Sequence, residues 1–227
     1  TTLLLDRLPA TISLALAAIV VALVIAIPLG SWAALREGRA ADNVIRVVSQ
    51  VGISVPDFWM GILLIGLFST ALGWLPSAGY SPLADGLGGW LEHLVLPAIT
   101  VGIVTGAIMT RYVRSSVLDV VNAPYVTTAE SKGLGRSRIL LCHVGRNALV
   151  PVLTISGIQF AALLGGVIVV EVVFAWPGLG LLVYDSVAAR DYPVLQGAIL
   201  LIAVIFLIVN LIVHILYAVI DPRIRLS

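Results

Sequence analysis

Long apolar runs separated by short charged stretches make up this chain. Five runs contain no Asp, Glu, Lys or Arg: residues 8–35, 58–84, 93–110, 147–170 and 192–220. A helix needs about 20 apolar residues to cross the hydrocarbon core of a bilayer, and these runs are long enough. The pattern predicts an all-α, polytopic integral membrane protein, a single domain over residues 1–227 with five transmembrane helices. We expect these helices at about residues 10–34, 46–71, 93–113, 147–170 and 194–219.

The second helix is expected to run from about Val44 to Leu72, with Pro56 inside it. Proline removes a backbone hydrogen bond and clashes with the preceding turn, so a kink is predicted there. Asp57 follows and is the one acid expected inside a span, where a charge costs about 2.5–3.5 kcal/mol on insertion scales. Asp57 either lines a pathway as a gating residue or accepts hydrogen bonds from backbone N–H groups that the kink exposes. The second interpretation is favoured.

Composition agrees with a location in lipid. Apolar residues make up 60% of the chain, charged residues make up 11%, and the mean hydropathy is +1.11. A soluble domain of this length could not cover its surface with so few charges. The formal net charge of +1 gives no reason to expect nucleic-acid binding, and Cys142, the only cysteine, excludes an internal disulfide.

Basic residues are distributed unevenly between the two sides that five spans define. Eleven of the 13 fall on the loops 36–46 and 111–146 and on the tail 221–227, and the other two are Arg7 and Arg190. Cytoplasmic segments of membrane proteins carry the excess of Lys and Arg, so the eleven-residue side is predicted to be cytoplasmic. The eleven are Arg36, Arg39, Arg46, Arg111, Arg114, Lys132, Arg136, Arg138, Arg146, Arg223 and Arg225.

The longest polar segment, residues 119–146, is predicted to form a short helix with Pro124 in its first turn. Gly133 and Gly135 end this helix, because glycine readily adopts the left-handed conformation found after helix ends. Ser137 is expected to cap a second helix that returns to the membrane. The segment is therefore either a lever between two spans or an ordinary amphipathic surface helix.

The segment resembles the EAA loop of ABC-importer permeases, in which a coupling helix sits in a groove on the ATPase subunit. Thr127-Thr128 stands where that pattern has Glu-Ala, and Gly145-Arg146 stands where it has Leu-Pro. The chain is more similar to the B-type subunits of the dipeptide, oligopeptide and nickel branch, which carry Tyr-Val-x-Thr-Ala-x-x-Lys-Gly-Leu. The matching residues are Tyr125, Val126, Thr128, Ala129, Lys132, Gly133 and Leu134.

Three further segments carry the same resemblance, which covers essentially the whole chain. They are residues 7–11, residues 174–180 together with 189–193, and residues 216–225. The resemblance implies the type I ABC-importer permease fold, which has six transmembrane helices in this family. The family's first helix and the extracytoplasmic region after it are expected to precede Thr1. The resemblance also implies that Glu130 and the seven residues that match the loop pattern couple the chain to the ATPase. In this arrangement Ala129 and Gly133 lie against the ATPase groove.

The resemblance also implies partners and a location. The chain is expected in the bacterial inner (plasma) membrane, as a heterodimer with a homologous permease subunit. Two ATPase subunits, which bind ATP and Mg, and an extracytoplasmic substrate-binding protein complete the importer. Di- and oligopeptides are the expected substrates, and nickel chelates or other small solutes are the alternative.

No motif for chemistry within the chain itself is found. A P-loop requires G-x-x-x-x-G-K-[ST], which does not occur, and Lys132 is the only lysine. Neither H-E-x-x-H nor G-x-S-x-G occurs, and the three histidines are not at metal-ligand spacing. We therefore expect no enzyme activity, no metal site and no cofactor of its own, with ATP hydrolysis by partner subunits.

Two groups of residues are candidates for the pathway. Residues 171–192 form the long connection on the less basic side, with Trp176 and Pro177 in a turn and Tyr184 in a short helix. Trp and Tyr also anchor helices at the membrane interface, which is the alternative interpretation. The resemblance implies instead that this loop lines the outer end of the pathway and meets the substrate-binding protein.

The second group is a small-xxx-small stripe of Gly157, Ala161 and Gly165 in the span at 147–170. Small residues let helices approach closely, so this stripe is expected to pack or slide against a partner helix. Two other classes of function are alternatives. A secondary transporter would need an ion site and internal repeats, and only Asp57 offers the former. A passive assembly subunit would need no cytoplasmic lever.

Overall fold

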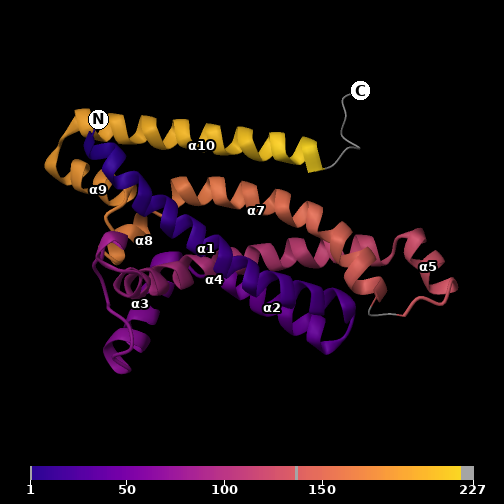
Figure 1. Cartoon of the computed structure of the whole chain (residues 1–227). Coiled ribbons are helices and arrows are strands. Elements are labelled where there is room, and N and C mark those ends of the chain that lie inside the picture. Colours follow the sequence, from indigo (N-terminus) through magenta and orange to yellow (C-terminus); the bar gives the residue numbers. More distant parts are fainter. Residues whose placement is uncertain (1, 136–137, 221–227) are drawn as a thin grey trace.

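The structure, a computed structural model, describes residues 2–135 and 138–220, and all regular structure within them is helical. Figure 1 shows a bundle elongated along its helices, with α9 (Leu179–Ala189) at one end and α5 (Pro124–Ser131) at the other. We refer to these as the α9 end and the α5 end. Arg136, the expected cap Ser137 and the tail with Arg223 and Arg225 lie outside the described residues.

The centre of the bundle is the pair α1 (Thr2–Leu35) and α4 (Leu87–Val121). Small residues bring the two helices together. A Cβ atom added at Gly102 would lie 2.5 Å from Val21, and one added at Gly106 would lie 3.3 Å from Ala22. Such backbone approach gives extensive van der Waals contact, which drives helix association inside a membrane.

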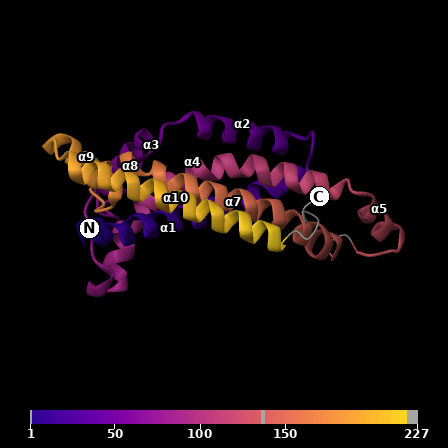
Figure 2. The same cartoon turned by 90° about the horizontal axis from the view of Figure 1, so that it is seen from above.

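Two further long helices complete one side of the bundle. α7 (Arg146–Gly166) packs against α4, and α10 (Tyr192–Ile220) packs against α7 (Figures 1 and 2). Large apolar side chains of α10 are exposed along its outer face, including Leu200, Leu207 and Leu211. In water such a surface would be unfavourable, whereas lipid or a partner subunit covers it at no cost.

The other side of the bundle contains a broken helix rather than a kinked one. α2 (Ala40–Ser54) and α3 (Asp57–Leu64), which continues as the π-helix η1 (Ile65–Ala71), meet at an angle of 99°. Val55 and Pro56 at the break are extended, with ψ of 124° and 139°. A residue before proline is forced out of the helical region, so the chain leaves the helix one residue before Pro56.

By length and composition, four helices of the described chain can cross a membrane, or five if α2 with α3–η1 is one bent span. The span expected at residues 147–170 begins and ends earlier than predicted, since the candidate span runs from Cys142 to Gly166. α7 ends at Gly166, and α8 (Ile168–Val173) is a separate short helix. The remaining elements are the 3₁₀ turn η2 (Leu83–Asp85) and the π-helix η3 (Ile139–Gly145), which leads into α7.

Candidate functional sites at the two ends of the bundle

The α5 end carries the short helix predicted from the sequence. α5 begins at Pro124, and after it Gly133 has a φ of +77°, as expected for a glycine that ends a helix. The N–H of Leu134 donates a hydrogen bond back to the carbonyl of Ala129 at 3.3 Å. This closes the helix end and fixes the direction in which the chain leaves it.

One face of α5 is built into the bundle. Val126 is 5% exposed and Ala129 is 8% exposed, and both belong to a buried apolar cluster. At 2.9 Å the Nδ2 group of Asn147 in α7 donates a hydrogen bond to the hydroxyl of Tyr125. The cluster also contains Val113 and Val117 of α4, Ile139 and Val144 of η3, and Ala148 and Val152 of α7. Val126 and Ala129 therefore anchor α5 in the same apolar cluster as α4, η3 and α7.

The other face of α5 is free. Thr128 on this face is exposed, as are Lys132 and Gly133 just after the helix, whereas Leu134 is partly buried. Glu130 belongs to α5, but its side chain lies outside the described part. The expectation for Ala129 needs correction: its methyl group faces the chain's own core, because α5 needs an apolar face to hold it on the bundle.

At the α9 end, a fully buried carboxylate ties three segments together. Glu171 of α8 is 0% exposed. The hydroxyl of Thr11 in α1 donates to its Oε1 at 2.7 Å, and the N–H groups of Gly180 and Leu181 donate to its Oε2 at 2.7 and 3.1 Å. Thr11 also accepts a hydrogen bond from the N–H of Leu179 at 2.8 Å. Buried charge is tolerated only when hydrogen bonds replace its hydration, as they do here.

The glycines of the Trp-Pro-Gly-Leu-Gly turn make room for this carboxylate. A Cβ atom at Gly178 would overlap the carboxylate of Glu171, and one at Gly180 would lie 2.5 Å from the Cα of Ile168. The first turn of α9 thus approaches α8 backbone to backbone. Any side chain at either position would move α9 away and break the hydrogen bonds to Glu171.

Trp176 is also part of this buried network rather than an open surface. It is fully buried, and its Nε1–H donates to the carbonyl of Ala10 at 2.8 Å. Its ring meets Tyr80 edge-on, with centroids 4.8 Å apart. In this conformation the indole neither lines a pathway nor anchors at a lipid interface, because the turn folds it inward. Pro177 is half-buried beside a cavity of about 400 Å³, and Tyr184 is 55% exposed on α9.

Asp57 occupies the first position of α3, at the break in the second span. It is half-buried, and its carboxylate accepts no hydrogen bond in the described part of the chain. The favoured interpretation of Asp57 as a backbone cap was therefore wrong. Pro56 occupies the N-cap position of α3, and Asp57 is already the first helical residue, so its carboxylate is not placed as a cap.

The stripe of small residues on α7 packs against neighbouring side chains at Gly157 and Ala161 but not at Gly165. A Cβ atom at Gly157 would lie 2.6 Å from Val213 of α10, and Ala161 is buried. At Gly165 an added Cβ would meet nothing within 4 Å among the described residues. Gly157 therefore sets the spacing between α7 and α10, whereas Gly165 faces open space.

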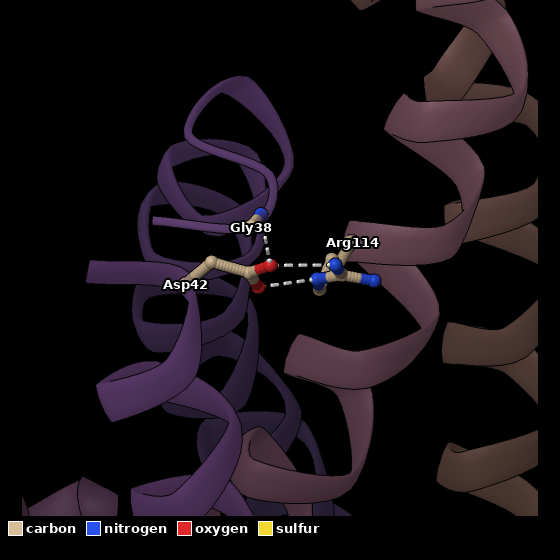
Figure 3. Close-up of polar contacts among 3 residues, drawn as sticks. All are labelled: Gly38, Asp42 and Arg114. Carbon is tan, nitrogen blue, oxygen red and sulfur yellow. Dashed lines mark hydrogen bonds and ion pairs between the residues drawn. The ribbon is translucent and has the colours of Figure 1, made fainter. Parts of the chain in front are cut away.

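Sequence reasoning missed two polar contacts that position these sites. One is Glu171 with Thr11. The other joins α2 to α4, where the guanidinium of Arg114 donates to both oxygens of Asp42, at 2.6 and 2.8 Å, and the N–H of Gly38 donates at 3.0 Å (Figure 3). A signal was present for the first, since Glu171 is a lone acid among valines. Nothing in the local pattern pairs Asp42 with a residue 72 positions away.

Comparison with known proteins agrees with this architecture. The family model described as "Binding-protein-dependent transport system inner membrane component" matches residues 26–226. The chain is 43% identical over 225 residues to the oligopeptide transport system permease protein AppB of Bacillus subtilis, covering 98% of this chain and 71% of that one. It is 44% identical over 220 residues to the glutathione transport system permease protein GsiC of Escherichia coli, covering 97% and 69%.

A solved structure shares the fold. The chain superposes on a chain of the inward-facing MetNI methionine ABC transporter with a TM-score of 0.80, covering 97% of each chain at 15% sequence identity. The expected fold class, an all-α membrane protein of the ABC-importer permease type, is therefore confirmed.

Proposed function

The chain belongs to the family of binding-protein-dependent transport system inner membrane components, and we propose that it carries di- or oligopeptides through the bacterial inner membrane as an ABC-importer permease subunit. The names of its relatives support the substrate class, since they include oligopeptide, di/tripeptide and glutathione transport systems. Nickel chelates or other small solutes carried by the same machinery are the alternative.

The proposed assembly contains more than this chain. A homologous permease subunit pairs with it, so that two sets of helices enclose the pathway. Two ATPase subunits, which hold ATP and Mg, bind at the α5 end, and a substrate-binding protein docks at the α9 end. The family description, which names binding-protein dependence, supports the last of these.

One observation carries the proposal. α5 is held on the bundle by Val126 and Ala129 and leaves its opposite face, with Thr128 and Lys132, uncovered. A segment that only covered the membrane surface would not need this anchor in the apolar cluster that it shares with α4, η3 and α7. In our proposal, ATP binding closes the ATPases and moves α5, and α4 and α7 follow. The pathway then alternates between two discrete packings that the nucleotide biases.

The experiment places a glutamate at Gly133. Among the described residues nothing lies within 4 Å of a Cβ atom added at this glycine, so the described bundle has room for the new side chain. We expect Gly133→Glu to insert and fold but to lose most ATP-driven peptide uptake and to co-purify with less ATPase. Uptake into vesicles and pull-down of the ATPase measure the two effects.

Gly38→Glu is the matched control. Gly38 also has a positive φ, +72°, and also has open space around it, and it lies in the α1–α2 loop at the same end of the bundle. Gly38→Glu therefore introduces the same kind of backbone strain and the same change in charge as Gly133→Glu. Normal uptake by Gly133→Glu, or equal losses in both variants, would contradict docking at α5.

A further inference from the structure

A basic cavity lies between α2 and α4, apart from both ends described above. Its volume is about 570 Å³, within the range of roughly 300–1,000 Å³ typical of small-molecule sites. No acidic residue is among the described residues that line it. They are Asn43, Arg46, Val47, Gln50, Arg111 and Arg114.

The three guanidinium groups of this cavity differ in how they are held. Arg114 is fixed by its two hydrogen bonds to Asp42, which is almost fully buried (Figure 3). Glu37, in the loop before α2, also favours the charged form of Arg114 electrostatically. Arg46 and Arg111 are exposed, and neither forms an ion pair within the described chain. The cavity therefore contains one guanidinium group in a fixed position, that of Arg114. It also contains two, those of Arg46 and Arg111, whose N–H groups are available to a ligand.

An apolar groove continues from this cavity towards the middle of the helices. A second cavity of about 470 Å³ shares Arg111 and is lined by Ile53, Ile108, Tyr112 and Ser115. On α2, Val47 lines the first cavity, and Ile53, further along the same helix, lines the second. A ligand with an anionic head and an apolar chain fits both parts, whereas a small hydrophilic anion fits only the first.

We propose that this cavity binds the phosphate headgroup of an anionic phospholipid, with Arg46 and Arg111 on the phosphate and an acyl chain in the second cavity, along Ile53 and Ile108. Arginine pairs with phosphate through two parallel hydrogen bonds. Basic pockets between membrane helices on the cytoplasmic side are typical sites for such headgroups. The site lies in the half of the bundle that carries α5, which the distribution of basic residues predicts to be cytoplasmic.

The test uses the full-length protein, purified with the subunits that accompany it and stripped of lipid in a neutral detergent. Dioctanoyl phosphatidylglycerol and dioctanoyl phosphatidylcholine are titrated separately, and bound lipid is counted by native mass spectrometry. We expect one phosphatidylglycerol to bind at least about tenfold more tightly than phosphatidylcholine. Arg46→Gln with Arg111→Gln should reduce that affinity at least about fivefold.

Arg7→Gln with Arg190→Gln, at the α9 end, removes the same charge and should leave the binding unchanged. Arg114 is kept in every variant because it holds α2 on α4. Equal binding of both lipids, or no loss in the Arg46/Arg111 variant, would overturn the proposal. Glycerol phosphate binding as tightly as the lipid would assign the cavity to a free anion instead. Displacement of the lipid by alanylalanine would assign it to the carboxylate of a solute.

Discussion

At the scale of single residues, Glu171 shows how this protein satisfies the hydrogen-bonding groups of a fully buried carboxyl. Its carboxylate is satisfied by one hydroxyl and two backbone N–H groups, from α1 and from the first turn of α9. The carboxylate therefore fixes the turn that carries Trp176 and Pro177 against α1. Through these hydrogen bonds it determines where the α9 end presents Pro177 and Tyr184.

Glu171→Leu is expected to destabilise the α9 end strongly. The substitution leaves three buried donors without an acceptor, and each such group costs about 1–3 kcal/mol. Glu171→Gln keeps one carbonyl oxygen and should fall between Leu and the native residue. The measurement is the thermal midpoint of the purified protein in one detergent.

Asp185→Leu is the control, because Asp185 is exposed on the neighbouring helix α9. It removes an acid of the same charge and should change the midpoint little. Equal midpoints for Glu171→Leu and Asp185→Leu would mean that the buried hydrogen bonds do not stabilise the protein.

Asp57 leads to a different prediction, because no hydrogen bond in the described chain depends on it. We expect Asp57→Asn to assemble normally and to keep most of its uptake. Asp57→Leu should also assemble, since removing a half-buried charge without a partner does not cost stability. Uptake and the amount of assembled protein are compared in both variants. Loss of uptake by a fully assembled Asn variant would assign the carboxylate to the pathway.

At the scale of elements, small residues determine how closely helices approach. Gly102 and Gly106 allow α1 to pack closely against α4, and Gly157 allows α10 to pack closely against α7. The stripe on α7 is therefore not uniform, since the same spacing places Gly165 beside open space. A stripe that is half occupied leaves one part of α7 available to another helix, consistent with the paired permease subunits proposed above.

Gly157→Val is expected to lower the thermal midpoint, because its Cβ would lie 2.6 Å from Val213 and α10 would have to move. Overpacking of this kind costs about 1–3 kcal/mol. Gly165→Val makes the same chemical change on the same helix and should leave the isolated subunit unaffected. A lower midpoint for Gly165→Val than for Gly157→Val would show that α7 and α10 do not pack as described.

The sequence predicted the elements better than the contacts between them. Apolar runs located the spans because each helix must satisfy its own backbone in lipid, and Pro124 and Gly133 marked the ends of α5. The break at Pro56 exceeded the expected kink, because local pattern does not reveal how far two half-helices diverge. Trp176 looked like a surface residue, because its partner Ala10 is 166 positions away.

At the scale of the whole molecule, the bundle has two chemically different ends. The half of the bundle that carries α5 also holds the ion pair of Asp42 with Arg114 and the basic cavity. The α9 end carries the buried network around Glu171 and the cavity beside Pro177. Docking of ATPases at one end and of a substrate-binding protein at the other requires the α5 end to face the cytoplasm. The positive-inside rule predicts the same orientation.

Cysteine labelling in whole cells tests this orientation with the native chain. Cys142, the only cysteine, is exposed in η3 at the α5 end, so a membrane-impermeant maleimide should label it only after permeabilisation. Asp185→Cys in a Cys142→Ser background places the thiol on the exposed surface of α9, where intact cells should be labelled directly. Both thiols must react fully after permeabilisation, which confirms that each is accessible. Labelling of Cys142 in intact cells would place α5 outside the cytoplasm, where no ATPase can reach it, and the coupling role proposed for α5 would fail.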